Sequence, residues 1–125
     1  MWIMTPYGFF SIVCAHGDNP HNAYPPPPHP ELMMIRARNR NHLEALKKRF
    51  VGLPEIDEES GTDYPCRITA PRAEVLRVIA TMADDVDYTN FKNEAHKVSP
   101  NDKPFHTFLM SIWRLGLKLT NGGYE

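Results

Sequence analysis

The sequence contains 125 residues, which is enough for one domain with one hydrophobic core. Hydrophobic residues make up 42% and charged residues 23% of the chain, a globular composition that excludes wholesale disorder. With 14 basic and 15 acidic side chains the net charge is −1, so we predict no DNA partner, while a local basic patch stays open.

Hydropathy and cysteine content predict the cellular location of the protein. No apolar run reaches the roughly 18 to 20 residues that cross a membrane, and the N-terminus lacks the basic start and long apolar segment of a signal peptide. Cys14 and Cys66 lie in predicted strands and form no CxxC motif, so we expect buried thiols in a reducing compartment. The sequence therefore predicts a cytoplasmic protein without a membrane partner.

The first predicted element is a pair of strands over residues 2–15. Pro6 suits the second position of a turn over residues 5–8, and Gly8 suits the fourth. Residues 8–15 carry no charge and are rich in β-branched and aromatic side chains. This composition is typical of an inner strand with both faces covered.

A proline-rich inserted loop follows at residues 16–31. Prolines fix φ and remove backbone donors, so this segment is expected to be an exposed connector, with a polyproline II stretch at 25–28. A docking peptide for a partner's aromatic groove is the alternative. The histidines in this loop match no metal-ligand spacing, and we predict no metal ion and no other cofactor.

The middle of the chain predicts a strand, a helix and a second strand. A strand is expected at 32–38, then a helix capped by Asn39 or Asn41 that ends before Gly52. Residues 55–63 read as an acidic turn segment, and 64–70 as the next strand.

Three helices complete the predicted order. The first covers about 71–85 and clamps the sheet through an apolar stripe, and a short one capped by Asp87 or Thr89 runs through residue 97. The last covers 105–119, with Asp102 as its cap. The order β-β-β-α-β-α-α predicts an α+β fold: an antiparallel sheet of about four strands, with two to three helices mainly on one face, as in a ferredoxin-like sandwich.

The last predicted helix is apolar on two faces. One broad face runs from Phe105 through Ile112 and Leu115 to Leu119 and suits the core. A second face carries the candidate partner surface, formed by His106, Met110, Trp113 and Leu117. Such a helix is either buried on both faces or shared with a protein partner or a second copy.

The best candidate for a ligand-binding site in this sequence is a set of arginines. Arg36, Arg38 and Arg67 are expected to project from one face of the sheet, with Phe9 beside them. Arginines next to an aromatic ring on an open sheet suit phosphates and stacked bases. These four residues are the candidate ligand-binding site. The alternative is that the arginines form structural salt bridges to Glu58, Glu59 or the C-terminal segment.

Catalytic motifs do not emerge from the sequence. It contains no Walker loop, GxGxxG, GxSxG or HExxH, and nothing places a nucleophile beside a base, so we name no catalytic residue. Asp84, Asp85, Asp87 and His96 raise a metal-dependent hydrolase as a minor alternative. Enzymatic activity is left open, with a non-enzymatic protein favoured.

Several motifs spread along the chain resemble those of a small family of bacterial and phage proteins without an assigned activity. They are residues 1–5 (MWIMT) with 8–13 (GFFSIV), 36–38 (RAR), 63–65 (DYP), 87–92 (DYTNFK), and the late His106 and Trp113. The resemblance spans the chain except for the proline-rich loop. It implies a single domain over residues 1–125 and names no catalytic residue.

Three functions follow as hypotheses. The first is a non-enzymatic binding or regulatory protein, such as a phage or bacterial accessory factor that binds a host protein. The second is a nucleotide- or RNA-binding module that uses the arginine-bearing sheet face. The third is the metal-dependent hydrolase named above.

Overall fold

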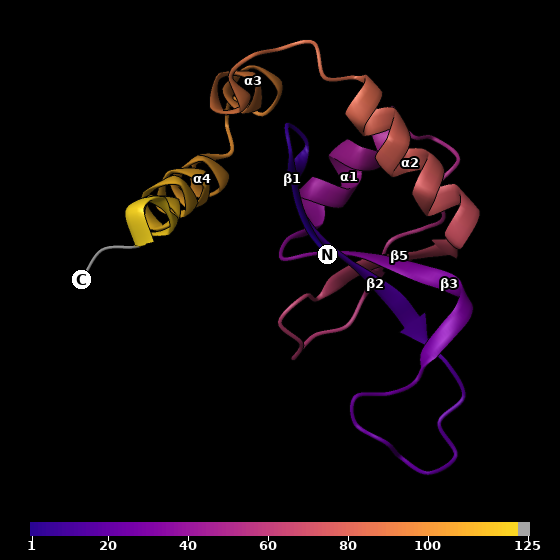
Figure 1. Cartoon of the computed structure of the whole chain (residues 1–125). Helices are drawn as coiled ribbons and strands as arrows, with labels where there is room; N and C mark the ends of the chain where they lie inside the picture. The colour runs from indigo at the N-terminus through magenta and orange to yellow at the C-terminus, as the bar shows by residue number, and fades with distance from the viewer. Residues whose placement is uncertain (123–125) are drawn as a thin grey trace.

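Five antiparallel strands form one sheet in the computed structural model, which describes residues 1–122 (Figure 1). The strand order is β1-β2-β3-β5-β4. The elements in chain order are β1 (Trp2–Thr5), β2 (Gly8–His16), β3 (Pro28–Ala37), α1 (Arg40–Arg49), β4 (Asp57–Glu58), β5 (Cys66–Pro71), α2 (Arg72–Asp84), α3 (Phe91–Val98), α4 (Lys103–Gly116) and a 3-10 helix (Leu117–Gly122).

The hairpin of β1 and β2 is the predicted one. Thr5 Oγ1 accepts a hydrogen bond from the Tyr7 amide at 3.1 Å and donates to the Gly8 carbonyl at 3.3 Å, which closes the turn. β2 pairs with β1 on one side and with β3 on the other, so the uncharged arm is an inner strand, as the sequence predicts. Ile12 of β2 lies directly opposite Ile35 of β3.

One face of the sheet carries the main core, where α1 and α2 pack (Figure 1). The apolar positions of each element share one face because strands alternate every residue and helices repeat every three to four. The fully buried large members are Phe10, Ile35, Leu43, Leu46, Ile68, Val75 and Val78. Each contributes about 1.5–3 kcal/mol, so this layer is the main source of stability.

The other two helices do not pack on that face. Phe9 follows the opposite pleat from Phe10 and joins a second cluster with Tyr64, with Ala95 of α3, and with Phe105 and Leu109 of α4. The prediction of helices mainly on one face therefore holds for α1 and α2 and is wrong for α3 and α4. The α+β class is confirmed, and the ferredoxin-like topology is not.

The predicted strand count missed β4. Asp57 and Glu58 pair with Arg67 and Cys66 at the edge of the sheet. Both residues are exposed, so no hydrophobic alternation marks them as a strand and only backbone pairing defines it.

Several predicted boundaries also differ. β3 begins at Pro28 rather than at residue 32, since Pro28 already lies opposite His16. A proline is tolerated at the first residue of a strand. α1 is preceded by Asn39, α4 is capped by the predicted Asp102, and α3 is capped by Asn90, not by Asp87 or Thr89.

Candidate functional site

The predicted ligand-binding arginines lie together on the face of the sheet opposite the main core. Arg36 of β3 and Arg67 of β5 are direct cross-strand partners, and Ser11 of β2 lies opposite Arg36. Arg38 follows two residues after Arg36, past the end of β3. The register therefore gathers the three arginines as the sequence predicts.

Two of these arginines lie over the ring of Tyr64. The guanidinium carbon of Arg36 is 4.7 Å from the centroid of the Tyr64 ring, and that of Arg38 is 4.5 Å from it. Arg36 also donates to Ser11 Oγ at 2.8 Å, and Arg38 Nη1 donates to the Asp63 carbonyl at 2.9 Å. These contacts fix the segment that precedes β5 over the sheet.

Arg67 of β5 binds the same segment. Its Nη2 donates to the Tyr64 carbonyl at 3.1 Å and to Thr62 Oγ1 at 3.4 Å, and its Nη1 lies 3.5 Å from a Glu59 carboxylate oxygen. Arg36 and Arg67 are thus partly engaged within the protein, and the Nε of each is buried without a hydrogen-bond partner among residues 1–122. Arg38 is exposed, and no hydrogen bond in residues 1–122 uses its Nε or Nη2.

An aromatic cavity of about 500 Å³ opens between this face and α4. Phe9, at the predicted ligand site, lies in its wall, with its ring centroid 5.0 Å from that of Phe108 and 6.0 Å from that of Trp2. Arg38 and Asn39 line it beside Tyr64. Its volume falls in the range of about 300–1,000 Å³ that small-molecule pockets occupy.

His42 of α1 forms part of the cavity wall and is 5% exposed. The Phe9 amide donates to its Nδ1 at 3.3 Å, so the proton of the neutral ring lies on Nε2, which donates to Asp102 Oδ2 at 2.8 Å. Both ring nitrogens are therefore occupied, and the imidazole–carboxylate pair holds α4 against the hairpin. This arrangement favours a structural role over proton transfer.

The environment of Asp102 lowers its pKa. Burial acts to raise the pKa of Asp102, but hydrogen bonds from His42, from the Phe105 amide and from Asn41 outweigh burial and hold it below its ordinary value. The carboxylate is therefore the form that the folded state favours.

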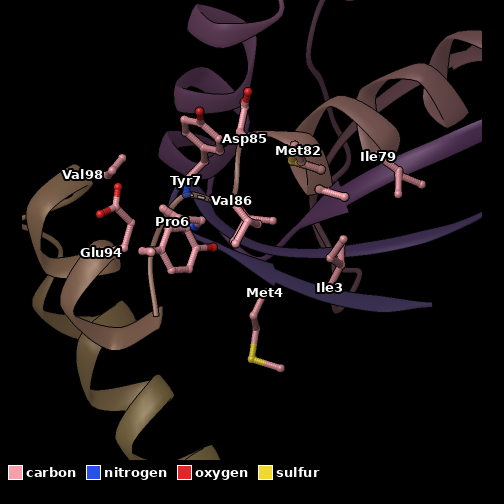
Figure 2. A pocket seen from close by; sticks show the side chains of 13 residues that line it. Ile3, Met4, Pro6, Tyr7, Ile79, Met82, Asp85, Val86, Glu94 and Val98 are labelled. Carbon is pink, nitrogen blue, oxygen red and sulfur yellow. Dashed lines mark hydrogen bonds between the residues drawn. The ribbon is translucent and has the colours of Figure 1, made fainter. Parts of the chain in front are cut away.

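A smaller cavity of about 200 Å³ lies at the other side of the hairpin turn. Figure 2 shows Ile79 and Met82 of α2 on one side, Glu94 and Val98 of α3 on the other, and Pro6 and Tyr7 between them. Tyr88 lines the same cavity. Burial is the larger cause that raises the pKa of its hydroxyl, and the nearby Glu94 raises it further. The residues that line this cavity are mainly apolar. They come mainly from the hairpin, α2 and α3, so the cavity lies where α3 meets these elements.

The predicted partner surface on α4 is largely exposed. Every residue from 110 to 119 is exposed. Trp113 is 53% exposed and lies under Lys92, whose Nζ is 4.7 Å from the indole centroid. The predicted core face of this helix is wrong beyond Leu109, because Ile112, Leu115 and Leu119 are exposed as well.

His106 differs from the other members of the predicted partner surface. It is partly buried, its Nε2 donates to the Ser99 carbonyl at 2.6 Å, and its ring stacks on His96 with centroids 3.7 Å apart. These contacts tie α4 to the end of α3, so His106 positions the helix while Met110, Trp113 and Leu117 face solvent.

The acidic residues of the hydrolase hypothesis do not converge. In residues 1–122 no group of three or more histidine, cysteine, aspartate or glutamate side chains is arranged to hold a metal ion. Asp85 instead accepts two hydrogen bonds of 3.0 Å from the guanidinium of Arg49. His96 stacks on His106, away from that ion pair.

Of the residues that line the cavity, the sequence placed only Phe9 and Arg38 at a ligand site, and Trp2, His42 and Tyr64 are among those it missed. A signal existed for Trp2, which shares the period-two face of Met4, and Met4 lies opposite Phe9. The sequence predicts Tyr64 as the first residue of a strand. In the structure it precedes β5, and its ring lies against the arginines. His42 carries no sequence signal, since its role depends on contacts across 33 and 60 residues.

No helix within the described residues is long and apolar enough to span a membrane. Comparison of the chain with known protein families, with curated proteins and with solved structures gave no match.

Proposed function

We propose that the protein is a non-enzymatic binding protein of regulatory or accessory type, and that a partner protein docks on the second half of α4 and the turn after it. This proposal rests on the solvent exposure of apolar side chains in this part of the chain. The apolar side chains concerned are Met110, Ile112, Trp113, Leu115, Leu117 and Leu119, and all of them face solvent. A helix that is apolar on two faces is normally buried or shared with a partner.

The energetics support a partner at this surface. Fully burying one such side chain contributes about 1.5–3 kcal/mol, and none of the six is buried in the isolated chain. Trp113 and the leucines beside it resemble the aromatic and aliphatic anchors at the centre of protein interfaces.

The charge of α4 and the turn after it favours a different protein, rather than a second copy of this chain, as the partner. Residues 103–120 include Lys103, Arg114 and Lys118 and contain no aspartate or glutamate. A symmetric pair of α4 helices would bring these basic side chains together, whereas an apolar groove with an acidic rim would complement them. The proposed partner is therefore a protein with such a groove.

The two other hypotheses have less support. Arg36 and Arg67 are partly buried and use some of their guanidinium donors on Ser11, the Tyr64 carbonyl and Glu59, which weakens the case for a phosphate- or RNA-binding sheet face. We also propose, beyond the α+β class, a ferredoxin-like arrangement of the sheet and helices and a relation to the bacterial and phage family that the sequence motifs resemble. Free thiols at Cys14 and Cys66 support a cytoplasmic location.

Photocrosslinking tests the proposed surface. A benzoylphenylalanine at position 113 is expected to give a discrete crosslinked product in the cells that naturally produce the protein, and the product should weaken as salt is raised. Leu76 of α2 is the matched control, because it is also 53% exposed and lies on another surface. Equal products from both positions, or a product that is only a dimer of this chain, would contradict the proposal.

A further inference from the structure

The cavity beside α4 has a chemistry that the partner surface does not explain. Its walls present aromatic rings from Trp2, Phe9, Tyr64, Phe105 and Phe108. Aromatic rings favour offset or edge-on contacts with another ring, so these walls suit a flat aromatic group better than an aliphatic chain.

Arg38 gives the cavity its charge. Among the described residues that line it, Arg38 is the one with a formal charge, since the proton arrangement of His42 is that of a neutral ring. Stacking on Tyr64 and the bond from Nη1 to the Asp63 carbonyl hold the guanidinium in place. Its remaining edge, Nε and Nη2, has the geometry that takes a carboxylate through two parallel hydrogen bonds.

Asn39 adds a neutral polar group to the lining of the cavity. Its side chain makes no capping hydrogen bond to α1, although the residue occupies the N-cap position. Asn39 lines the same cavity as Arg38, so its amide is available to a ligand there.

We propose that this cavity binds a small planar aromatic carboxylate, with its ring among Phe9, Tyr64 and Phe108 and its carboxylate on Arg38. The volume of about 500 Å³ accommodates one or two fused rings. A nucleotide fits the lining less well, because Arg38 is the one charged side chain among the described lining residues, and a phosphate and a ribose together need further polar partners. This inference does not require a partner on α4, although the two sites adjoin at Ile112, which lines the cavity and also belongs to the partner surface.

Calorimetry and tryptophan fluorescence with 2-naphthoate test the site. Saturable one-to-one binding is expected, with quenching of Trp2, which is 69% exposed at the cavity, and not of Trp113. The variants Trp113→Phe and Trp2→Phe separate the two signals. Quenching confined to Trp113 would place the ligand on the α4 surface and overturn the inference, as would no saturable binding.

Charge variants test the role of Arg38. Arg38→Gln is expected to weaken binding about tenfold to a hundredfold, the range for charge-assisted hydrogen bonds, while 2-naphthalenemethanol binds both proteins equally weakly. Arg77→Gln is the matched control, since Arg77 is exposed on α2, which packs on the opposite face of the sheet. Both arginines are exposed, so both variants should fold, which thermal melting checks.

Three outcomes would overturn the assignment. Equal weakening by Arg38→Gln and Arg77→Gln would mean that net charge alone attracts the probe. Equal affinity for the neutral alcohol would mean that the cavity is only apolar. Displacement of 2-naphthoate by adenosine monophosphate at similar concentration would assign the site to a nucleotide.

Discussion

The imidazole of His42 and the carboxylate of Asp102 lie 2.8 Å apart, although the two residues are 60 positions apart in the chain. The same ring accepts a hydrogen bond from the Phe9 amide, and the same carboxylate caps α4 through the Phe105 amide at 3.2 Å. The hairpin, α1 and α4 therefore meet at one largely buried pair. This pair positions both the aromatic cavity and the exposed half of α4.

Asp102→Ala should destabilise the protein more than the loss of an ordinary helix cap. A cap alone is worth about 0.5–2 kcal/mol, and the hydrogen bond to His42 adds about 1.5–3 kcal/mol because one partner is charged. Asn90→Ala is the matched control, since Asn90 caps α3 through the Asn93 amide at 3.0 Å without a second buried partner. Urea unfolding measures both variants, and equal losses would show that the pair adds nothing to the cap.

Acid should weaken the same connection. The folded pKa of Asp102 is lowered, so its stabilisation is fully present above the unfolded value of about 3.9 and is lost as pH falls through the folded pKa. The difference in unfolding free energy between the natural protein and Asp102→Asn should therefore shrink below about pH 4. Urea titrations at a series of pH values measure it, and a difference that grows in acid would contradict the assignment.

Gly8→Ala should be severely destabilising. Gly8 has a φ of +151°, and a Cβ there would lie 2.3 Å from Cγ of His42, so the ring would have to move. A loss of several kcal/mol is expected, at the upper end of single-residue effects. Gly116→Ala is the control, because no atom lies within 4 Å of a Cβ at that position in α4. It should be neutral or stabilise by up to about 1 kcal/mol, and similar melting temperatures for the two variants would contradict the close approach.

Tyr64 should matter through its ring rather than its hydroxyl. It is 4% exposed and makes cation–π contacts with Arg36 and Arg38, each contact being worth about 0.5–1 kcal/mol. Tyr64→Phe should change the unfolding free energy by less than about 0.5 kcal/mol, whereas Tyr64→Leu should lower it by about 2 kcal/mol. Chemical denaturation distinguishes the two, and equal effects would mean that stacking is unimportant.

The sequence predicted those elements whose signal is local. The hairpin turn at Pro6, the apolar stripe of α2 and the Asp102 cap depend on neighbouring residues, and each forms as expected. The shared face of Arg36 and Arg67 followed from strand alternation once register was inferred.

The rest depends on contacts between distant segments. The cavity forms where Trp2, Tyr64 and Phe105 meet, and no local pattern connects these residues. The contacts of Tyr64 with two arginines could not be predicted without knowing how the acidic segment folds back over the sheet. Periodicity alone could not separate a buried from an exposed apolar face of α4, because both faces repeat every three to four residues.

Acrylamide quenching of Trp113 in a Trp2→Phe variant, measured together with molecular mass by light scattering, tests the central claim most directly. The proposed partner surface predicts a monomer in which the Trp113 quenching rate approaches that of a solvent-exposed tryptophan. A monomer in which Trp113 is shielded would show that α4 packs into the core, and this result would contradict the claim.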